Sequence, residues 1–131
     1  MNMTITTTSV REIVDLTDRL FEVVRTFSTG IVVLNAPHTT VALFVTELDN
    51  ELSSDYLRVT ERLLENGRPY AHFRNNNPNT EAHILSAMFG TSVTLSVSDG
   101  MLQLGRYQRV VLFELDGPKT RTVFLTHVGS A

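Results

Sequence analysis

Apolar side chains recur at helical spacing in the first two thirds of the chain. In the clearest stretch, steps of four, four, three and four residues separate Leu48, Leu52, Tyr56, Val59 and Leu63. This spacing places the five side chains on one face of a helix, and Gly67 follows where a left-handed residue would end it. A shorter helix is predicted over 80–88, with Asn79 or Thr80 as its cap and Gly90 as its stop.

An earlier helical stretch has two competing starting points. Its apolar positions are Leu16, Leu20, Val23, Val24 and Phe27. Ser9 stands three residues before Glu12, and Asp15 stands three residues before Asp18. Both spacings are typical of a helix N-terminus, so the residues leave both starts open.

The remaining patterned segments are typical of strands. They are short apolar runs, or they alternate apolar with polar residues, and they cover 3–9, 31–35, 41–46, 92–97, 109–115 and 121–128. The first is rich in threonine and suits a sheet edge. Asp99-Gly100 is a hairpin signal, and the last two strands are expected to complete a meander. With about seven strands and three helices, we predict a single α+β domain over 1–131, with a mostly antiparallel sheet.

Composition narrows the chemistry that this domain can carry. The 131 residues include no cysteine, which excludes disulfides, thiolate metal sites and cysteine nucleophiles. A formal net charge of −3 does not suggest a nucleic-acid-binding protein. No apolar run is long enough to span a bilayer, and the first residues resemble no export signal. We therefore expect a soluble, cytoplasmic protein that contacts neither membrane nor nucleic acid.

Three of the four histidines share a context that suggests a site. His38 lies between two predicted strands, His72 lies in a polar loop, and His83 lies about one turn into the short helix that follows. Imidazole is the commonest metal-ligating side chain, and three of them with a carboxylate can leave a position open for water or substrate. Scattered histidines are also typical of hydrogen-bonded loop groups, so the spacing leaves both interpretations open. His127, inside the last strand, is expected to be structural.

Two further features could complete such a site. Glu47 is the expected carboxylate, and we expect the strand over 41–46 to bring it alongside His38. The asparagine-rich stretch 74–79 suits either a solvated turn or a lid. The helix start near Asn79 can support an anionic group.

The segment 104–108 is a second place where a ligand could bind. Gly105 in a strand suggests a bulge or a close approach of another backbone. Arg106 can bind phosphate or carboxylate, Tyr107 offers a stacking face, and Gln108 offers an amide. An outward-facing hairpin strand would have the same composition, so both interpretations stay open.

The last strands carry more apolar surface than one small helical layer can cover. Apolar residues alternate on both sides of 110–113 and 123–125. Long apolar strands with open edges invite pairing with other chains. We therefore expect a homo-oligomer that covers them.

Several short motifs recur in an order that is characteristic of one family. They are Pro37-His38-Thr39-Thr40, Thr46-Glu47, Tyr70-Ala71-His72, Asn79 with Ala82-His83-Ile84, and Leu102-Gln103-Leu104-Gly105 with Gln108. In order and spacing these motifs resemble the YjbQ-like family, also called the secondary thiamine-phosphate synthase family. The similarity runs over nearly the whole chain, from 13–17 through 116–118 to the final strand.

The resemblance implies a compact α+β domain that assembles as a homotrimer, with a pocket near the subunit interface. The catalytic residues gathered there would be His38, His72, His83 and Glu47. The three histidines would hold a divalent metal ion, zinc or magnesium, in some members. The implied activity is a weak thiamine-phosphate synthase, which joins a pyrimidine pyrophosphate to a thiazole phosphate and releases pyrophosphate. The residues expected to bind this small phosphorylated substrate are Thr39, Arg74, Asn79, Gly105, Arg106 and Gln108.

The chain departs from the family pattern at two places that bear on substrate choice. Gly105-Arg106-Tyr107-Gln108 stands where the family usually has Gly-Thr-Trp-Gln, and Thr46 stands where it usually has asparagine. Two alternatives to a synthase stay open. One is a metal-dependent hydrolase of another small phosphorylated or carboxylated substrate, and the other is a non-catalytic trimeric module that binds a ligand or metal.

Overall fold

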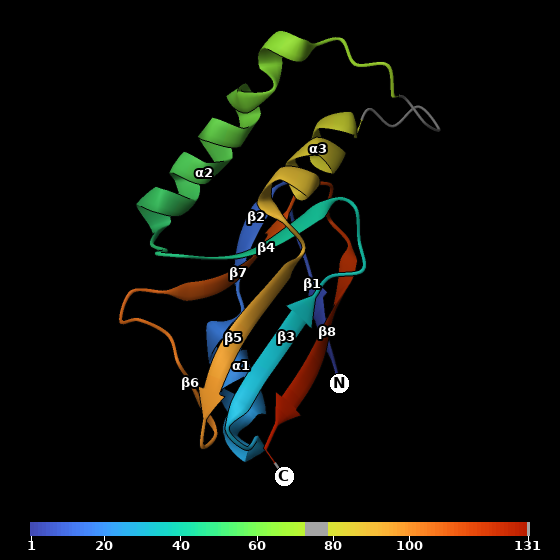
Figure 1. The fold of residues 1–131 in the computed structure, drawn as a ribbon. Coiled ribbons are helices and arrows are strands. Elements are labelled where there is room, and N and C mark those ends of the chain that lie inside the picture. Colours follow the sequence, from blue (N-terminus) through green and yellow to red (C-terminus); the bar gives the residue numbers. More distant parts are fainter. Residues whose placement is uncertain (73–78, 131) are drawn as a thin grey trace.

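Two antiparallel sheets, stacked on each other, form the body of the computed structural model, which describes residues 1–72 and 79–130 (Figure 1). The larger sheet has the strand order β1-β8-β3-β5-β6, with bounds Asn2–Thr6, Thr120–Gly129, Gly30–Asn35, Ser92–Ser98 and Met101–Leu102. The smaller sheet has the order β2-β7-β4, with bounds Glu12–Asp15, Arg109–Glu114 and Val41–Thr46. This architecture confirms the predicted α+β class.

The described residues form three α-helices, α1 (Thr17–Val23), α2 (Asn50–Leu63) and α3 (Thr80–Phe89). α2 begins after Asp49, whose carboxylate accepts a hydrogen bond from the Leu52 N–H at 2.7 Å. α3 ends at Gly90, which has a φ of +90° that favours glycine. None of these helices is both long and apolar enough to cross a membrane.

The smaller sheet is packed on both of its faces. Toward the larger sheet, Val110 and Leu112 of β7 join the main core. Toward the helices, Phe113 packs with Leu85 of α3 and lies edge-on to the ring of Tyr56 of α2. The chain's own helices and second sheet therefore cover β7, which was one of the two apolar strands that suggested an oligomer.

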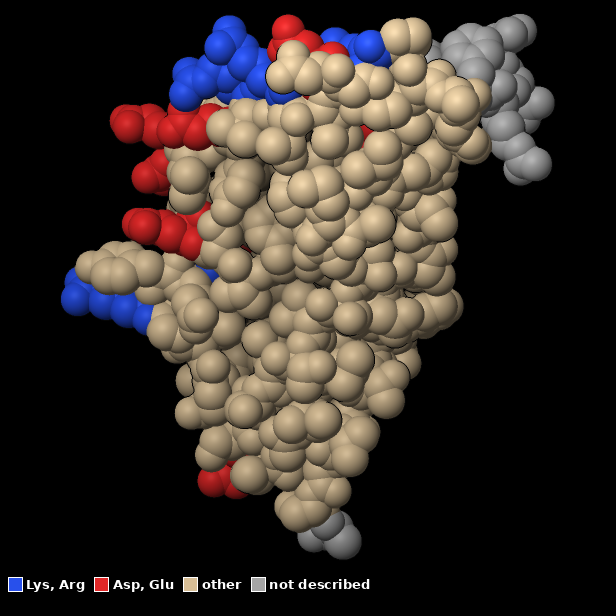
Figure 2. Space-filling view, turned by 45° about the horizontal axis from the view of Figure 1, so that its top comes forward, with Lys and Arg blue, Asp and Glu red and all other residues tan. Residues whose placement is uncertain are grey.

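The outer face of the larger sheet carries no charged side chain on β1, β3, β5 or β8. Alternation along β8 points Val123 and Leu125 into the core and leaves Phe124 and Val128 outside. The neighbouring strands add Ile31 and a set of serine and threonine side chains. Figure 2 shows the charged side chains gathered along the helical end and one edge, away from this face.

Two predictions about the elements are wrong, and the structure decides between the two open starts of the first helix. No helix starts at Ser9, because Glu12–Asp15 forms β2, in which Ile13 and Val14 face opposite sides of the smaller sheet. The start near Asp15 is the one observed, since α1 begins at Thr17, whose N–H donates to the Asp15 carboxylate at 2.9 Å. β7 and β8 do not form a meander, because they belong to different sheets. Gly67 is not left-handed, because the chain passes from α2 into a 3₁₀ turn over Glu65–Gly67.

The other predicted elements are confirmed within a few residues. β4 has the predicted bounds, and β1 lies at the sheet edge. Asp99 and Gly100 have φ values of 45° and 78°, which are the left-handed conformations that a two-residue hairpin requires. His127 is structural, because its ring stacks on Phe27 and its Nε2 lies 3.0 Å from the carbonyl oxygen of Ser28.

Candidate functional site

The segment 36–40 links β3 to β4, and residues of β8 hold it in place. β3 ends at Asn35, and beyond it the Thr122 N–H donates to Nε2 of His38 at 3.0 Å. A ring nitrogen that accepts a hydrogen bond carries no hydrogen, so His38 must carry its hydrogen on Nδ1. Burial, together with the nearby charge of Arg121, lowers the pKa of His38, which favours this neutral form.

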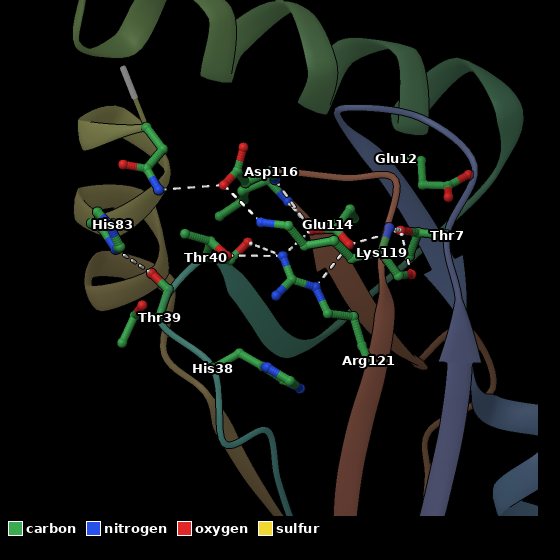
Figure 3. A network of polar contacts seen from close by, with 12 residues as sticks. Thr7, Glu12, His38, Thr39, Thr40, His83, Glu114, Asp116, Lys119 and Arg121 are labelled. Carbon is green, nitrogen blue, oxygen red and sulfur yellow. Dashed lines mark hydrogen bonds and ion pairs between the residues drawn. The ribbon is translucent and has the colours of Figure 1, made fainter. Parts of the chain in front are cut away.

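A buried ion pair lies behind this segment (Figure 3). Arg121 of β8 donates through Nε to Glu114 at 2.8 Å and through Nη2 to the second carboxylate oxygen at 2.5 Å. The same Nη2 donates to Oγ1 of Thr40 at 2.8 Å. Burial acts to raise the pKa of the Glu114 carboxyl, but hydrogen bonds from Arg121 and Thr7 outweigh it, and the pKa is lowered. The pair thus ties β7 and β8 to the loop before β4.

His83 lies on the other side of this loop. Its Nδ1 lies 3.0 Å from the carbonyl oxygen of Thr39. Since a carbonyl oxygen only accepts, Nδ1 carries the hydrogen, and Nε2 of the neutral ring keeps its lone pair. The ring of His72 meets His83 edge to face, with 5.0 Å between the centroids. His72 and His83 therefore form a pair, while His38 points toward β8 (Figure 3).

These contacts limit how the three histidines fit a metal ion. A zinc site needs at least three protein ligands, and each imidazole binds through a nitrogen lone pair. The Nε2 lone pair of His38 is engaged by Thr122. Within residues 1–72 and 79–130, no group of three or more metal-ligating side chains is placed to hold an ion. One chain brings together two of the predicted ligands, His72 and His83, and the complete three-histidine site does not fit within it.

Glu47 lies at the opposite end of β4 from His38. Val41 at one end of β4 pairs with Glu114, and Thr46 at the other end pairs with Arg109. The five residue steps between them span about 17 Å, and Glu47 is exposed just past the far end. The prediction that this strand brings Glu47 alongside His38 is wrong for a single chain, because an extended strand keeps its two ends apart.

The segment 104–108 lies at the same end of the sheet as Glu47, because it immediately precedes β7. It forms a turn and not a bulge. The N–H of Gln108 donates to the Gly105 carbonyl at 3.1 Å, and the N–H of Gly105 donates to the side-chain oxygen of Gln108 at 2.7 Å. Arg106 lies over the exposed ring of Tyr107, 5.4 Å from its centroid. Arg106 and Tyr107 are therefore presented on the outside of the turn.

Asn79 stands at the start of α3, close to the histidine pair. Its amide nitrogen donates to Asp116 at 3.3 Å, and its side chain makes no hydrogen bond that caps the helix. Its Oδ1 is buried without a partner among the described residues. Arg74, predicted to bind substrate, lies outside the described residues, as does most of the stretch 74–79.

A pocket of about 730 Å³ opens beside the start of α3, with His72 and Asn79 in its lining. Charged groups on its wall are already paired. Arg68 makes a two-pronged contact with Glu81, whose second oxygen lies 3.8 Å from Arg11. The hydrogen bond from Arg68 lowers the pKa of Glu81. The pocket reaches His72 of the histidine pair and offers space for a small ligand.

Arg121 and Glu114 were not predicted from the sequence as residues of the site. Glu114 closes the apolar run of β7, and Arg121 stands next to the start of β8. Both positions are typical of exposed charges at strand ends. One sequence feature could have indicated the pair: a negative charge stands at the end of one apolar strand, and a positive charge stands seven residues later near the start of the next. Only the fold shows that the two side chains meet inside the molecule.

The sequence matches one family over nearly its whole length. The family described as UPF0047 protein YjbQ-like matches residues 1–130. A UPF0047 protein from Archaeoglobus fulgidus is 38% identical over 125 residues, which cover 95% of this chain and 98% of that protein. The UPF0047 protein YugU from Bacillus subtilis is 31% identical over 130 residues, with 95% and 96% coverage.

Solved structures share the fold. A hypothetical protein from Aeropyrum pernix K1 has a TM-score of 0.91 and 32% identity, and the match covers 99% of this chain and 98% of that one. A YbjQ-like protein of unknown function from Sulfolobus solfataricus P2 has a TM-score of 0.88 and 27% identity, with 95% and 92% coverage. None of these four proteins is described with an activity.

Proposed function

The chain belongs to the YjbQ-like UPF0047 family, and we propose that it is an enzyme of the secondary thiamine-phosphate synthase type. Its reaction joins a pyrimidine pyrophosphate to a thiazole phosphate. A bond forms between the pyrimidine's methylene carbon and the thiazole nitrogen. The bond from that carbon to pyrophosphate breaks, and its electron pair leaves with the pyrophosphate. Such an enzyme must bind phosphate groups and stabilise the departing negative charge.

One observation supports a catalytic site most directly. Two half-buried imidazoles, His38 and His83, flank the loop before β4, and a backbone contact holds each in one orientation. The buried guanidinium of Arg121 contacts Thr40 of the same loop, on the side where His38 lies (Figure 3). Donors and charges that are fixed before the reaction need no reorganisation when charge develops. This arrangement suits a departing pyrophosphate.

The proposal includes a homotrimer in which neighbouring chains complete each site. Glu47 and 104–108 lie at one end of β4, and the histidines lie at the other. In a closed ring of identical chains joined head to tail, the two ends come from different copies and meet at every interface. The uncharged outer face of the larger sheet supports contact between copies, since Phe124 and Val128 are 40% and 57% exposed there.

We propose a divalent metal ion only in a form in which His72 and His83 are its imidazole ligands. Its other ligands would have to come from outside this pair, because a catalytic zinc site has three protein ligands. Elemental analysis of the purified protein tests this part. Bound zinc should disappear in His72→Ala and in His83→Ala and persist in His127→Gln. Equal metal content in all four proteins would remove the metal from the proposal.

The test of the activity is formation of thiamine phosphate with release of pyrophosphate in equal amounts. The unchanged protein should form both products, and His83→Ala should form neither. His127→Gln is the matched control, because a glutamine amide can replace the Nε2 contact with Ser28. Turnover of another phosphorylated compound without thiamine phosphate would favour a hydrolase. Binding without turnover would favour a non-catalytic module.

A further inference from the structure

The hydrogen bond from Thr122 occupies one ring nitrogen of His38 and leaves the N–H of the other to contact a ligand. Nε2 accepts the Thr122 N–H at 3.0 Å, so the neutral ring carries its hydrogen on Nδ1. A nitrogen that carries a hydrogen has no lone pair for a metal ion or a proton. His38 is therefore built as a hydrogen-bond donor. This differs from His83, whose Nδ1 faces a carbonyl and whose Nε2 keeps its lone pair.

Arg121 has donors to spare beside this ring. Its Nε and Nη2 are engaged by Glu114 and Thr40, and no described residue accepts a hydrogen bond from its Nη1. The side chain is 5% exposed, and its carboxylate partner is fully buried. Glu114 occupies one side of the guanidinium, so the remaining N–H groups on Nη1 point elsewhere. Figure 3 shows the imidazole of His38 on the side away from Glu114.

Neither unused donor is fully sealed from solvent. Among the described residues, Asn79 Oδ1 is the one side-chain polar atom that is sealed from solvent without a partner. Nδ1 of His38 and Nη1 of Arg121 are therefore open to a ligand. Their anchors are adjacent, because Thr122 follows Arg121 in β8 and holds the His38 ring. A small group that accepts hydrogen bonds and carries negative charge suits two such donors, and bonds of this kind are stronger than neutral ones.

We propose that Nδ1 of His38 and Nη1 of Arg121 bind one phosphate group of a ligand, with both residues as donors. The site itself follows from hydrogen bonds in this chain. It rests on the proposed function only for the identity of the molecule that carries the phosphate. It also gives the histidines different roles: His38 donates a hydrogen bond to the anion, whereas His83 keeps a free lone pair on Nε2.

Nitrogen-15 NMR of the full chain labelled at histidine tests the proposal, with inorganic phosphate as the probe. His38 and His83 should both carry their hydrogen on Nδ1. His127 is an internal reference of opposite type, because its Nε2 donates to a carbonyl. Added phosphate should shift the Nδ1 signal of His38 and leave that of His127 in place. A hydrogen on Nε2 of His38, or a His38 signal that phosphate does not move, would overturn the proposal.

Two substitutions test the two ring nitrogens of His38 one at a time. An asparagine amide nitrogen can occupy the position of Nδ1, whereas the glutamine side chain reaches the position of Nε2. His38→Asn should therefore keep phosphate affinity within about threefold, and His38→Gln should weaken it about tenfold or more, because it loses a charge-assisted hydrogen bond. His127→Gln should bind phosphate like the unchanged protein. Equal affinity of His38→Asn and His38→Gln would contradict the donor role.

Failure of the phosphate site can be distinguished from failure of the proposed activity. Phosphate that binds through His38 in a protein that makes no thiamine phosphate would overturn the activity and leave the phosphate site standing. Thiamine-phosphate formation that is unchanged in His38→Gln would overturn the phosphate site and leave the activity standing. Melting curves of both His38 variants show whether each is folded before its affinity is compared.

Discussion

Replacing a histidine that binds a ligand should cost less stability than replacing one that packs in the core. The ring of His83 is half-buried, and its specific contacts are the Thr39 carbonyl and the ring of His72. Removal of a large core side chain costs about 2–5 kcal/mol. Loss of one partly exposed hydrogen bond costs about 1 kcal/mol. His83→Ala should therefore abolish thiamine-phosphate formation and lower the melting temperature only slightly.

The melting temperatures should be compared in chelator, because a bound metal would itself stabilise the folded chain by mass action. His127→Ala is the contrasting variant, since the stack of His127 on Phe27 makes it a packing residue. A metal-free His83→Ala protein that melts as far below its parent as His127→Ala does would show that His83 packs and does not bind.

The buried carboxylate of Glu114 gives the protein a specific sensitivity to acid. Its folded pKa lies below the usual value of 4.5. A carboxyl whose pKa is lowered by folding contributes stability that is fully present above the unfolded value. That contribution is lost as pH falls through the folded value. Urea unfolding at a series of pH values should show the free energy of unfolding declining below about pH 4.5.

Glu114→Gln isolates this contribution from those of Asp15 and Glu81, whose pKa values are also lowered. At neutral pH the variant leaves the guanidinium of Arg121 buried without its counter-charge, which should cost about 3–5 kcal/mol. In acid the difference between variant and parent should shrink, because the parent carboxyl is then protonated. A difference that stays constant from pH 7 to pH 3 would mean that Glu114 does not titrate as described.

At the scale of elements, the start of α2 depends on a single cap. The carboxylate of Asp49 accepts the Leu52 N–H at 2.7 Å and is exposed to solvent. Asp49→Ala should lower the free energy of unfolding by about 1 kcal/mol, whereas Asp49→Asn keeps an acceptor and should change it by a few tenths. Chemical denaturation of the two variants measures both values. Equal losses would indicate that charge, and not the cap hydrogen bond, stabilises this end.

Periodicity predicted the elements well where one pattern was present. The run 41–46 is apolar throughout and forms β4 with those bounds, and the spacing from Leu52 to Leu63 forms α2. The strand over 12–15 was not predicted, because the capping pattern of Ser9 and Glu12 overlaps it. A four-residue strand gives only two residues per face, so its alternation is too brief to outweigh a capping pattern.

The candidate site could be predicted less completely, for reasons of geometry. The motif context correctly grouped His72 with His83, whose rings meet. The direction of a side chain depends on contacts with residues far along the chain, such as Thr122 for His38. The same holds for Arg121 and Glu114, which meet because two sheets stack. The prediction that β4 brings Glu47 alongside His38 was an avoidable error, since the strand over 41–46 lies between them and an extended strand keeps its two ends apart.

At the scale of the whole molecule, the exposed face of the larger sheet is the expected contact between copies. Light scattering at micromolar concentration should give a mass three times that of the 14.7 kDa chain. Phe124→Lys adds a charge in the middle of this face and should shift the mass toward that of one chain. Arg25→Glu, a charge change on an exposed side chain outside the face, should leave the mass unchanged. A monomer mass for the unchanged protein would rule out the shared site.

The shared site also predicts that two inactive chains can repair each other. His83→Ala removes a group from one end of β4, and Glu47→Ala removes a group from the other. In the proposed assembly, each site takes its histidines from one chain and its glutamate from the next. An intact site therefore forms wherever a Glu47→Ala chain supplies the histidines and a His83→Ala chain supplies the glutamate.

The most direct test is therefore thiamine-phosphate formation by the two variants alone and after they are unfolded and refolded together in equal amounts. Each variant alone should be inactive. The mixed assembly should regain about a quarter of the activity of the unchanged protein, because random mixing in a head-to-tail ring leaves that share of interfaces intact. No recovery in mixed trimers, when unchanged protein refolded in parallel is active, would contradict a site completed by neighbouring chains.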